Sequence, residues 1–174
     1  MPNIHTRSDF QLLEKELDPI LLELGASLYV CQGFEQTLIF LLAIVEMENA
    51  EMAEGSLASA IDSLSQRTLG QLLKRLHQKL DITTELDSAF EAAWTARNWI
   101  AHEFLHDTAA SMRDQEGRQK IRNRLMKSKL TVKRGDHLAI KLLDEYISQF
   151  GPAIEDMRTS AEHLWHKLHP SPRN

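Results

Sequence analysis

Cysteine is nearly absent from this sequence: Cys31 is the only one among 174 residues. A single thiol excludes an internal disulfide and any metal site built from several cysteines. Long apolar runs are also missing, since the longest, 38–45, is far below the roughly 20 residues that a membrane-spanning helix needs. Residues 1–9 are polar and lack the pattern of a signal peptide. We therefore expect a cytoplasmic protein that does not enter a membrane.

Glycine and proline are scarce as well, at seven and five residues, and residues that favour helices dominate. Only 129–132 resembles a strand. Caps and apolar spacing predict helices at about 8–18, 19–48, 56–64, 69–80, 84–106, 109–126 and 136–169, with a basic linker over 127–135 and a kink at Gly151-Pro152. The prediction is an all-α, antiparallel up-and-down bundle of four to five core helices plus a long C-terminal helix. We expect one domain over 1–174, with its core at about 18–150 and a helical extension at 151–174.

Charge is unevenly distributed along the chain. The segment 113–134 contains nine basic and two acidic residues, a local charge of +7, which leaves −12 for the rest of a chain whose net charge is −5. A basic block on an acidic body is what a phosphate-tracking surface would produce. The candidate RNA-binding residues are Arg118, Arg122, Arg124, Lys127, Lys129, Lys133 and Arg134. No aromatic residue lies among them to stack on bases, so a solvated helix and linker is the alternative interpretation.

One charged residue interrupts the apolar pattern of the second predicted helix. Its inward positions follow a heptad: Leu21, Leu24, Leu28, Cys31, Glu35, Leu38, Leu42 and Val45. Glu35 stands where the pattern calls for an aliphatic residue, and a buried carboxylate requires a cationic or hydrogen-bonding partner.

The helix predicted over 84–106 carries the second misplaced charge. At 100° per residue, Arg97 lies at the centre of an apolar stripe formed by Leu86, Phe90, Ala93, Trp94, Ile100, Ala101 and Phe104. A polar stripe about 140° away contains Glu91, Thr95, Asn98, His102 and His106. A guanidinium in an apolar stripe is costly unless it is paired. We therefore predict that Arg97 and Glu35 contact each other across two packed helices. The alternative interpretation is that this is a purely structural ion pair, in which Arg97 has no catalytic role.

The three tryptophans are predicted to be core or interface anchors. Trp99 lies off the apolar stripe, which favours a contact in a dimer over burial within one chain.

The string Ala96-Arg97-Asn98-Trp99-Ile100-Ala101-His102-Glu103-Phe104 resembles the signature of the HEPN superfamily, in which an arginine and a polar residue precede a histidine by four to six positions. The segment 68–73 is similar to the preceding helix of small members. This resemblance covers about 18–150, and only its six-residue core is specific.

The resemblance implies a metal-independent endoribonuclease without a cofactor, acting as a homodimer whose two motifs face a shared cleft. His102 would act as general base or acid at the ribose 2′-hydroxyl, Arg97 would stabilise the phosphate, and Asn98 would orient either one. Glu35, Glu91 and Thr95 are the supporting residues. The products would be a 2′,3′-cyclic phosphate and a 5′-hydroxyl. Small members also imply a toxin of a toxin–antitoxin or phage-defence pair, with a nucleotidyltransferase-type antitoxin. A non-catalytic binding or regulatory protein on the same scaffold is the alternative.

Two further features qualify this interpretation. On an ideal helix Arg97 and His102 diverge by about 140°, so the helix must be distorted there or a second subunit must complete the site. The same region, His102-Glu103-Phe104-Leu105-His106, also spells the zinc-hydrolase motif H-E-x-x-H. Asp107 follows the second histidine, where such enzymes usually carry an uncharged residue, and no upstream sheet is expected. Zinc hydrolysis is therefore a remote alternative.

Overall fold

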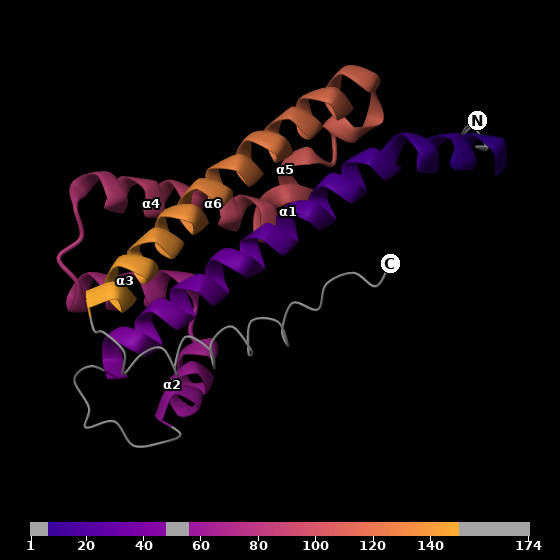
Figure 1. The fold of residues 1–174 in the computed structure, drawn as a ribbon. Coiled ribbons are helices and arrows are strands. Elements are labelled where there is room, and N and C mark those ends of the chain that lie inside the picture. Colours follow the sequence, from indigo (N-terminus) through magenta and orange to yellow (C-terminus); the bar gives the residue numbers. More distant parts are fainter. Residues whose placement is uncertain (1–6, 48–55, 150–174) are drawn as a thin grey trace. The chain divides into compact units, whose positions relative to one another are not determined.

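The computed structural model describes residues 7–47 and 56–149, and these residues are helical, with no strand among them. The elements are α1 (Arg7–Met47), α2 (Ser56–Ser65), α3 (Leu69–Lys79), α4 (Thr84–Asn98), η1 (Trp99–Glu103), α5 (Phe104–Thr108), η2 (Ser111–Arg113) and α6 (Gln115–Gln149) (Figure 1). The all-α bundle is thus confirmed. The predicted extension at 151–174 and the kink at Gly151-Pro152 lie outside the described residues.

The predicted break at Asp18-Pro19 is wrong, because α1 continues through Pro19. An internal proline removes one backbone hydrogen bond and crowds the preceding turn. Tertiary contacts on both sides of it hold the helix: Glu16 forms an ion pair with Arg118 of α6, and Ile20 is buried. Packing here outweighs the local signal for a new helix.

The predicted linker at 127–135 and the strand-like segment at 129–132 are also wrong, since both belong to α6. Leu125, Val132 and Ala139 are fully buried at heptad spacing along this helix. Gly135, which suggested a chain break, is instead required for packing. A Cβ at this position would lie 2.6 Å from Cβ of Ala93 in α4, so glycine allows the close approach of α6 to α4.

The prediction of a helix that begins at 109 is wrong, because the chain forms a turn there and α6 begins only at Gln115. After α5 and the short 3₁₀ turn η2, the Asp114 carboxylate accepts a hydrogen bond of 2.7 Å from the Gly117 N–H and so caps α6. A Cβ on Gly117 would lie 2.0 Å from the Ser111 carbonyl oxygen. The tight return of the chain therefore depends on this glycine.

The chain divides into two compact units, and α1 and α6 contribute to both. Unit 1 contains 1–35 and 81–137, which includes α4, η1, α5 and η2. Unit 2 contains 36–80 and 138–174, which includes α2 and α3.

In unit 1, α1 and α6 run parallel and α4 runs antiparallel to both. The direction follows from the contacts: Glu16 and Glu23 of α1 pair in order with Arg118 and Lys129 of α6. Along α4, by contrast, Ala93 faces Gly135 and the later Trp99 faces the earlier Arg124. Phe34 of α1 and Phe90 of α4 pack with ring centroids 6.0 Å apart. The arrangement places residues 97–102 beside α1.

The heptad predicted for α1 is correct only in part. Cys31, Leu38, Leu42 and Val45 are buried, but Leu21 and Leu28 are 56% and 37% exposed. Ile20, Ser27 and Phe34 are buried instead, one residue earlier in each repeat. The predicted heptad and the observed one share Cys31, Leu38 and Val45 but differ by one residue at the other inward position of each repeat. The contacts of α1 with α4 and α6 select the heptad that contains Ile20, Ser27 and Phe34. Leu21, Leu22, Leu28 and Tyr29 consequently form an exposed apolar face of α1.

Unit 2 has an apolar core. The part of α1 after residue 36 is almost entirely buried, and Leu64, Leu69, Leu72 and Leu76 complete the core. Thr68 caps α3 with a reciprocal capping box to Gln71, which agrees with the predicted start of this helix at 69. Glu46 of α1 pairs with Arg75 of α3 through two hydrogen bonds.

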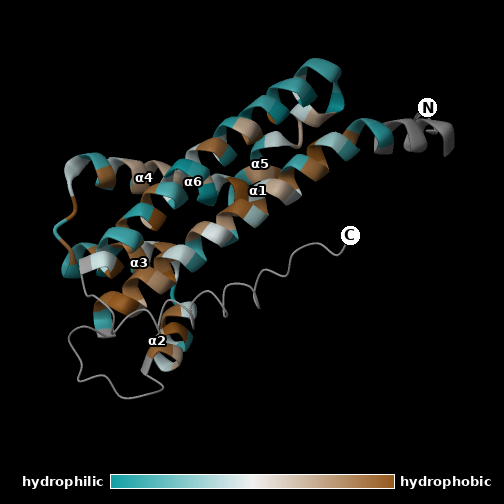
Figure 2. Ribbon diagram, viewed as in Figure 1, coloured by the Kyte–Doolittle hydropathy of each residue, from teal (hydrophilic) through white to brown (hydrophobic). Residues whose placement is uncertain are grey.

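Hydropathy sets one part of α1 apart. The apolar turns lie mainly in its second half, shown in brown in Figure 2. By length and composition, 15–46 could cross a membrane, and 61% of its most apolar window is buried within the protein. A core helix of a soluble protein passes the same test.

Candidate functional site

The site is built on α4, whose first turn is capped by Thr83. Its hydroxyl accepts a hydrogen bond of 3.3 Å from the Leu86 N–H, so the predicted helix start is confirmed. Phe90 and Ala93 are buried and anchor the helix against its neighbours. The helix then changes form: α4 ends at Asn98, and Trp99–Glu103 is a π-helical turn, η1.

Arg97 is the centre of a polar network within unit 1. Its Nε donates to Glu35 Oε1 at 2.5 Å, and its Nη1 donates to Asn98 Oδ1 at 3.2 Å. The same Nη1 lies 2.7 Å from His102 Nε2. The structure therefore brings together the three residues predicted to be catalytic and the carboxylate predicted to support them. The predicted contact between Arg97 and Glu35 is confirmed.

The π turn explains how Arg97 and His102 meet. Five residues on an α-helix rotate by about 140°, whereas the wider π turn, with its hydrogen bonds from i to i+5, places residues five apart on one side. Of the two alternatives left open by the sequence, a distorted helix or completion by a second subunit, the distorted helix is present. π turns inside α-helices occur frequently at functional sites.

The hydrogen bond also defines the state of the histidine. A guanidinium has donors only, so the ring nitrogen of His102 that faces it must be the acceptor. The tautomer that fits this contact carries its proton on Nδ1 and leaves Nε2 as the acceptor. His102 itself is exposed, whereas Arg97 and Glu35 are only 20% and 28% exposed. Arg97 is thus a largely buried cation, held in place by Glu35, beside an exposed imidazole. Such an arrangement can bind an anion and accept a proton.

Cys31 lies beside this pair on the core side of α1. Burial raises the pKa of its thiol to about 11, and the charge of Arg97 offsets part of that rise. The thiol therefore stays protonated and acts as a small apolar side chain.

Trp99 is held within unit 1, so the prediction that it forms a dimer contact instead of being buried in its own chain is wrong. The indole is 5% exposed and packs edge-on against Phe104, with ring centroids 5.7 Å apart. The guanidinium of Arg124 lies 3.9 Å from the indole centroid, a cation–π distance. The indole Nε1 donates to Asp107 Oδ2 at 3.1 Å.

Asp107 links these groups. Its carboxylate also lies 3.5 Å from Arg124, and its pKa is lowered by the hydrogen bonds from His106 and Trp99. Trp99, the first residue of the π turn, is buried. Asp107, which follows the turn in α5, accepts the hydrogen bond of its indole. These contacts hold the distorted segment that carries His102. Sequence reasoning did not identify Asp107 and Arg124 as a pair.

Two of the predicted supporting residues lie apart from the network. Glu91 and Thr95 are exposed on α4, and among the described residues neither has a hydrogen bond to Arg97, Asn98 or His102. Their place on the polar stripe is as predicted, but only Glu35 contacts the arginine.

The predicted RNA-binding residues separate into two groups. Three of them are paired with carboxylates of unit 1: Arg118 with Glu16, Arg124 with Asp107 and Lys129 with Glu23. The other four, Arg122, Lys127, Lys133 and Arg134, are exposed and form no ion pair within the described residues. They share the outer face of α6 with Met126 and Leu130, which are 45% and 61% exposed. We call these six residues the outer α6 face.

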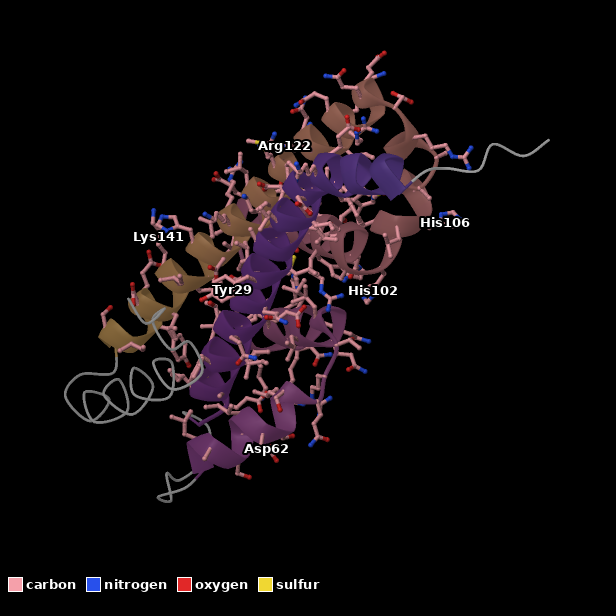
Figure 3. All side chains as sticks on the ribbon, turned by 90° about the vertical axis from the view of Figure 1, so that its right-hand side faces the viewer. Tyr29, Asp62, His102, His106, Arg122 and Lys141 are labelled. Carbon is pink, nitrogen blue, oxygen red and sulfur yellow. The ribbon has the colours of Figure 1, made fainter. Side chains whose placement is uncertain are left out.

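Arg122 of the outer α6 face does not lie beside His102 of the Arg97 network. Figure 3 shows Arg122 and His102 on opposite sides of α1. A phosphate bound at Arg122 is therefore not the phosphate that His102 of the same chain faces.

The two histidines of the H-E-x-x-H spelling are both exposed. Nε2 of His102 faces the Arg97 guanidinium, and Nδ1 of His106 lies 3.4 Å from Asp107. Within the described residues, no group of three or more histidine, cysteine, aspartate or glutamate side chains could hold a metal ion. The structure thus gives the zinc interpretation no third ligand among them.

Comparison with protein-family models, with curated proteins and with solved structures finds no match for this sequence.

Proposed function

We propose that this protein is a metal-independent endoribonuclease of the HEPN type. The observation that carries the proposal is the network on Arg97, in which one guanidinium contacts Glu35, Asn98 and His102 across a π turn. It combines a held cation, an amide and a neutral imidazole within a few ångströms. A phosphodiester cleaved by its own 2′-hydroxyl requires these three kinds of group.

In the proposed reaction, a phosphate oxygen replaces His102 as the acceptor at Arg97 Nη1. A charged oxygen is a stronger acceptor than an imidazole nitrogen, and the exchange frees His102 Nε2. That nitrogen takes the proton of the ribose 2′-hydroxyl, and the 2′-oxygen bonds to phosphorus. The bond from phosphorus to the 5′-oxygen breaks, and this oxygen takes up a proton from the imidazolium or from water. The products are a 2′,3′-cyclic phosphate and a 5′-hydroxyl.

Glu35 is a positioning residue in this scheme. Its carboxylate fixes Nε of Arg97 and leaves the Nη side of the guanidinium for the substrate. The side chains of Arg97 and Glu35 are only 20% and 28% exposed. The arginine is therefore already oriented before RNA binds, which lowers the free-energy cost of ordering it.

The proposal includes a homodimer that acts as the toxin of a toxin–antitoxin or phage-defence pair, with a nucleotidyltransferase-type antitoxin. The exposed apolar face of α1, formed by Leu21, Leu22, Leu28 and Tyr29, supports an interaction between chains. Exposed apolar side chains clustered on one helix face are typical of interaction sites.

A second candidate is a non-catalytic binding or regulatory protein. It is favoured by the outer α6 face, whose four cations form no ion pair within the described residues and whose Arg122 lies on the other side of α1 from His102 in Figure 3. A binding function at that face needs no contribution from His102.

The two candidates are separated by incubating total RNA with purified protein in EDTA, with the wild type beside His102→Ala. The nuclease proposal requires cleavage by the wild type in chelator and its loss in the variant. Cleavage that survives in His102→Ala, or that chelator abolishes, contradicts it. RNA binding without cleavage favours the second candidate.

A further inference from the structure

Trp94 is exposed next to the network, although its position in the apolar stripe predicted a core or interface residue. Its side chain is 38% exposed. Large aromatic residues bury 150–250 Å² when packed, so an indole left open to solvent forgoes a sizeable gain.

The position of Trp94 relative to the network is set by α4. It precedes Arg97 by three residues and Asn98 by four, and residues at these spacings are neighbours on one helix face. On the same helix, Ala93 faces α6 and Arg97 faces Glu35 of α1. At 100° per residue, Trp94 lies about 60° from Arg97 and on the side away from Ala93. The indole is therefore on the outer edge of α4, beside the guanidinium and amide.

We propose that the Trp94 indole is a stacking platform for one unpaired base of the RNA strand whose phosphate binds Arg97. This inference rests on the proposed function and adds the substrate class: single-stranded RNA. Nucleic-acid sites that accept single strands combine cations that bind the backbone with aromatic rings that stack on bases. Arg97 and Trp94 supply one of each, about one helical turn apart.

The proposed platform also resolves a difficulty in the charge distribution. The basic segment of α6 contains no aromatic residue, and its Arg122 lies on the opposite side of α1 from His102 in Figure 3. Trp94 provides the base contact at the reacting phosphate itself. Because every base has an aromatic face, such a platform is tolerant of sequence. A base inside an A-form duplex is stacked on its neighbours and is not available to the indole.

The test uses a short RNA oligonucleotide with 2′-O-methyl groups, which binds but cannot be cleaved. Binding should quench the fluorescence of Trp94, and the change should be absent in Trp94→Ala. Affinity should fall about tenfold or more in Trp94→Ala, and Trp94→Phe, which keeps a ring, should retain most of it. Ile140→Ala removes a large apolar side chain of α6 that is as exposed as Trp94, at 38%, and should bind as the wild type does.

Abasic positions in the oligonucleotide identify the contact directly. One abasic position should weaken binding to the wild type by about tenfold and leave binding to Trp94→Ala unchanged. Equal affinity of the wild type and Trp94→Ala for the intact oligonucleotide contradicts the platform. It is also contradicted if each single abasic position weakens binding to both proteins by the same factor. A second copy of the chain as the occupant would also contradict it and would appear as a loss of dimer in Trp94→Ala by sedimentation.

The platform and the nuclease proposal fail in distinguishable ways. If the unmodified RNA is cleaved through His102 and no abasic position couples to Trp94, the platform alone is wrong. If coupling is found but the unmodified RNA stays intact, the base contact stands and the nuclease proposal is wrong. Absence of binding by the folded wild type contradicts both. Cleavage of the single strand should also exceed that of the same sequence in a duplex.

Discussion

Arg97 Nη1 and His102 Nε2 lie 2.7 Å apart although five residues separate them on one helical segment. The π turn η1 brings them together, and the contacts of Trp99 with Phe104, Asp107 and Arg124 hold that turn. Within unit 1, the cation, the amide and the imidazole thus belong to one chain. This relationship leads to the following predictions.

Replacing Glu35 with Gln should separate the positioning role of the carboxylate from its contribution to stability. Loss of the charged acceptor at Arg97 Nε should lower kcat by about tenfold or more, because the guanidinium is no longer oriented. It should also destabilise the fold by roughly 1–2 kcal/mol, since the pair is only partly exposed. Glu16→Gln breaks the ion pair with Arg118 and is the matched control. Equal kcat in both variants would argue against a positioning role.

The ring state of His102 can be measured without any substrate. Because Arg97 can only donate, the structure predicts a neutral ring with its proton on Nδ1 and an unprotonated Nε2 in the free protein. The ¹⁵N chemical shifts of the histidine ring distinguish the two tautomers at a pH where the ring is neutral. Arg97→Ala should shift the mixture toward the Nε2-protonated form. A wild type that is already protonated on Nε2 would show that the hydrogen bond is absent in solution.

Asp107 should make stability depend on pH. Hydrogen bonds from His106 and Trp99 lower its pKa from the usual 3.8, so its stabilising contribution is present above that value. It is lost as the pH falls through the lower folded-state pKa. Asp107→Asn should thus have a lower Tm than the wild type at pH 7, and the gap should narrow below pH 3.8. Glu116→Gln, which breaks a highly exposed pair with Lys120, should show almost no difference at either pH.

The outer α6 face and the paired cations of α6 should respond differently to substitution. If RNA contacts the outer α6 face, Lys133→Ala should reduce the slope of log K against log salt by about 0.7 for a single strand. Its Tm should stay close to that of the wild type, because Lys133 has no ion pair within the described residues. Arg118→Ala should instead lower Tm through loss of its contacts with Glu16 and the Met112 carbonyl. An unchanged salt slope in Lys133→Ala would exclude that residue from the RNA contact.

Sequence reasoning could identify the pair between Glu35 and Arg97 because both charges interrupt apolar patterns, and an ion pair is the usual remedy. It could also predict the starts of the helices at 69 and 84, because the capping signals at these positions depend on only a few neighbouring residues. It could not choose between the two registers of α1, since both use apolar residues at shared positions. The choice depends on which face α4 and α6 cover.

The remaining errors have a common cause. Pro19 and Gly135 signal breaks when only neighbouring residues are considered, but contacts between helices decide the outcome at both positions. The π turn likewise cannot be derived from a fixed rotation of 100° per residue. Nor can the angle of a residue on one helix show which neighbours cover it: Trp99 was expected at a dimer interface and Trp94 inside an apolar stripe, whereas Trp99 is buried in the chain and Trp94 is partly exposed.

The most direct test of the account is a product analysis with one RNA oligonucleotide in EDTA. Mass spectrometry of the wild-type reaction should find a 2′,3′-cyclic phosphate on one fragment and a 5′-hydroxyl on the other. A single 2′-deoxy substitution at the cleaved nucleotide should abolish that cut, as should His102→Ala in the unmodified oligonucleotide. A cut that persists opposite the 2′-deoxy position, or a fragment with a 5′-phosphate, would contradict the role assigned to Arg97 and His102.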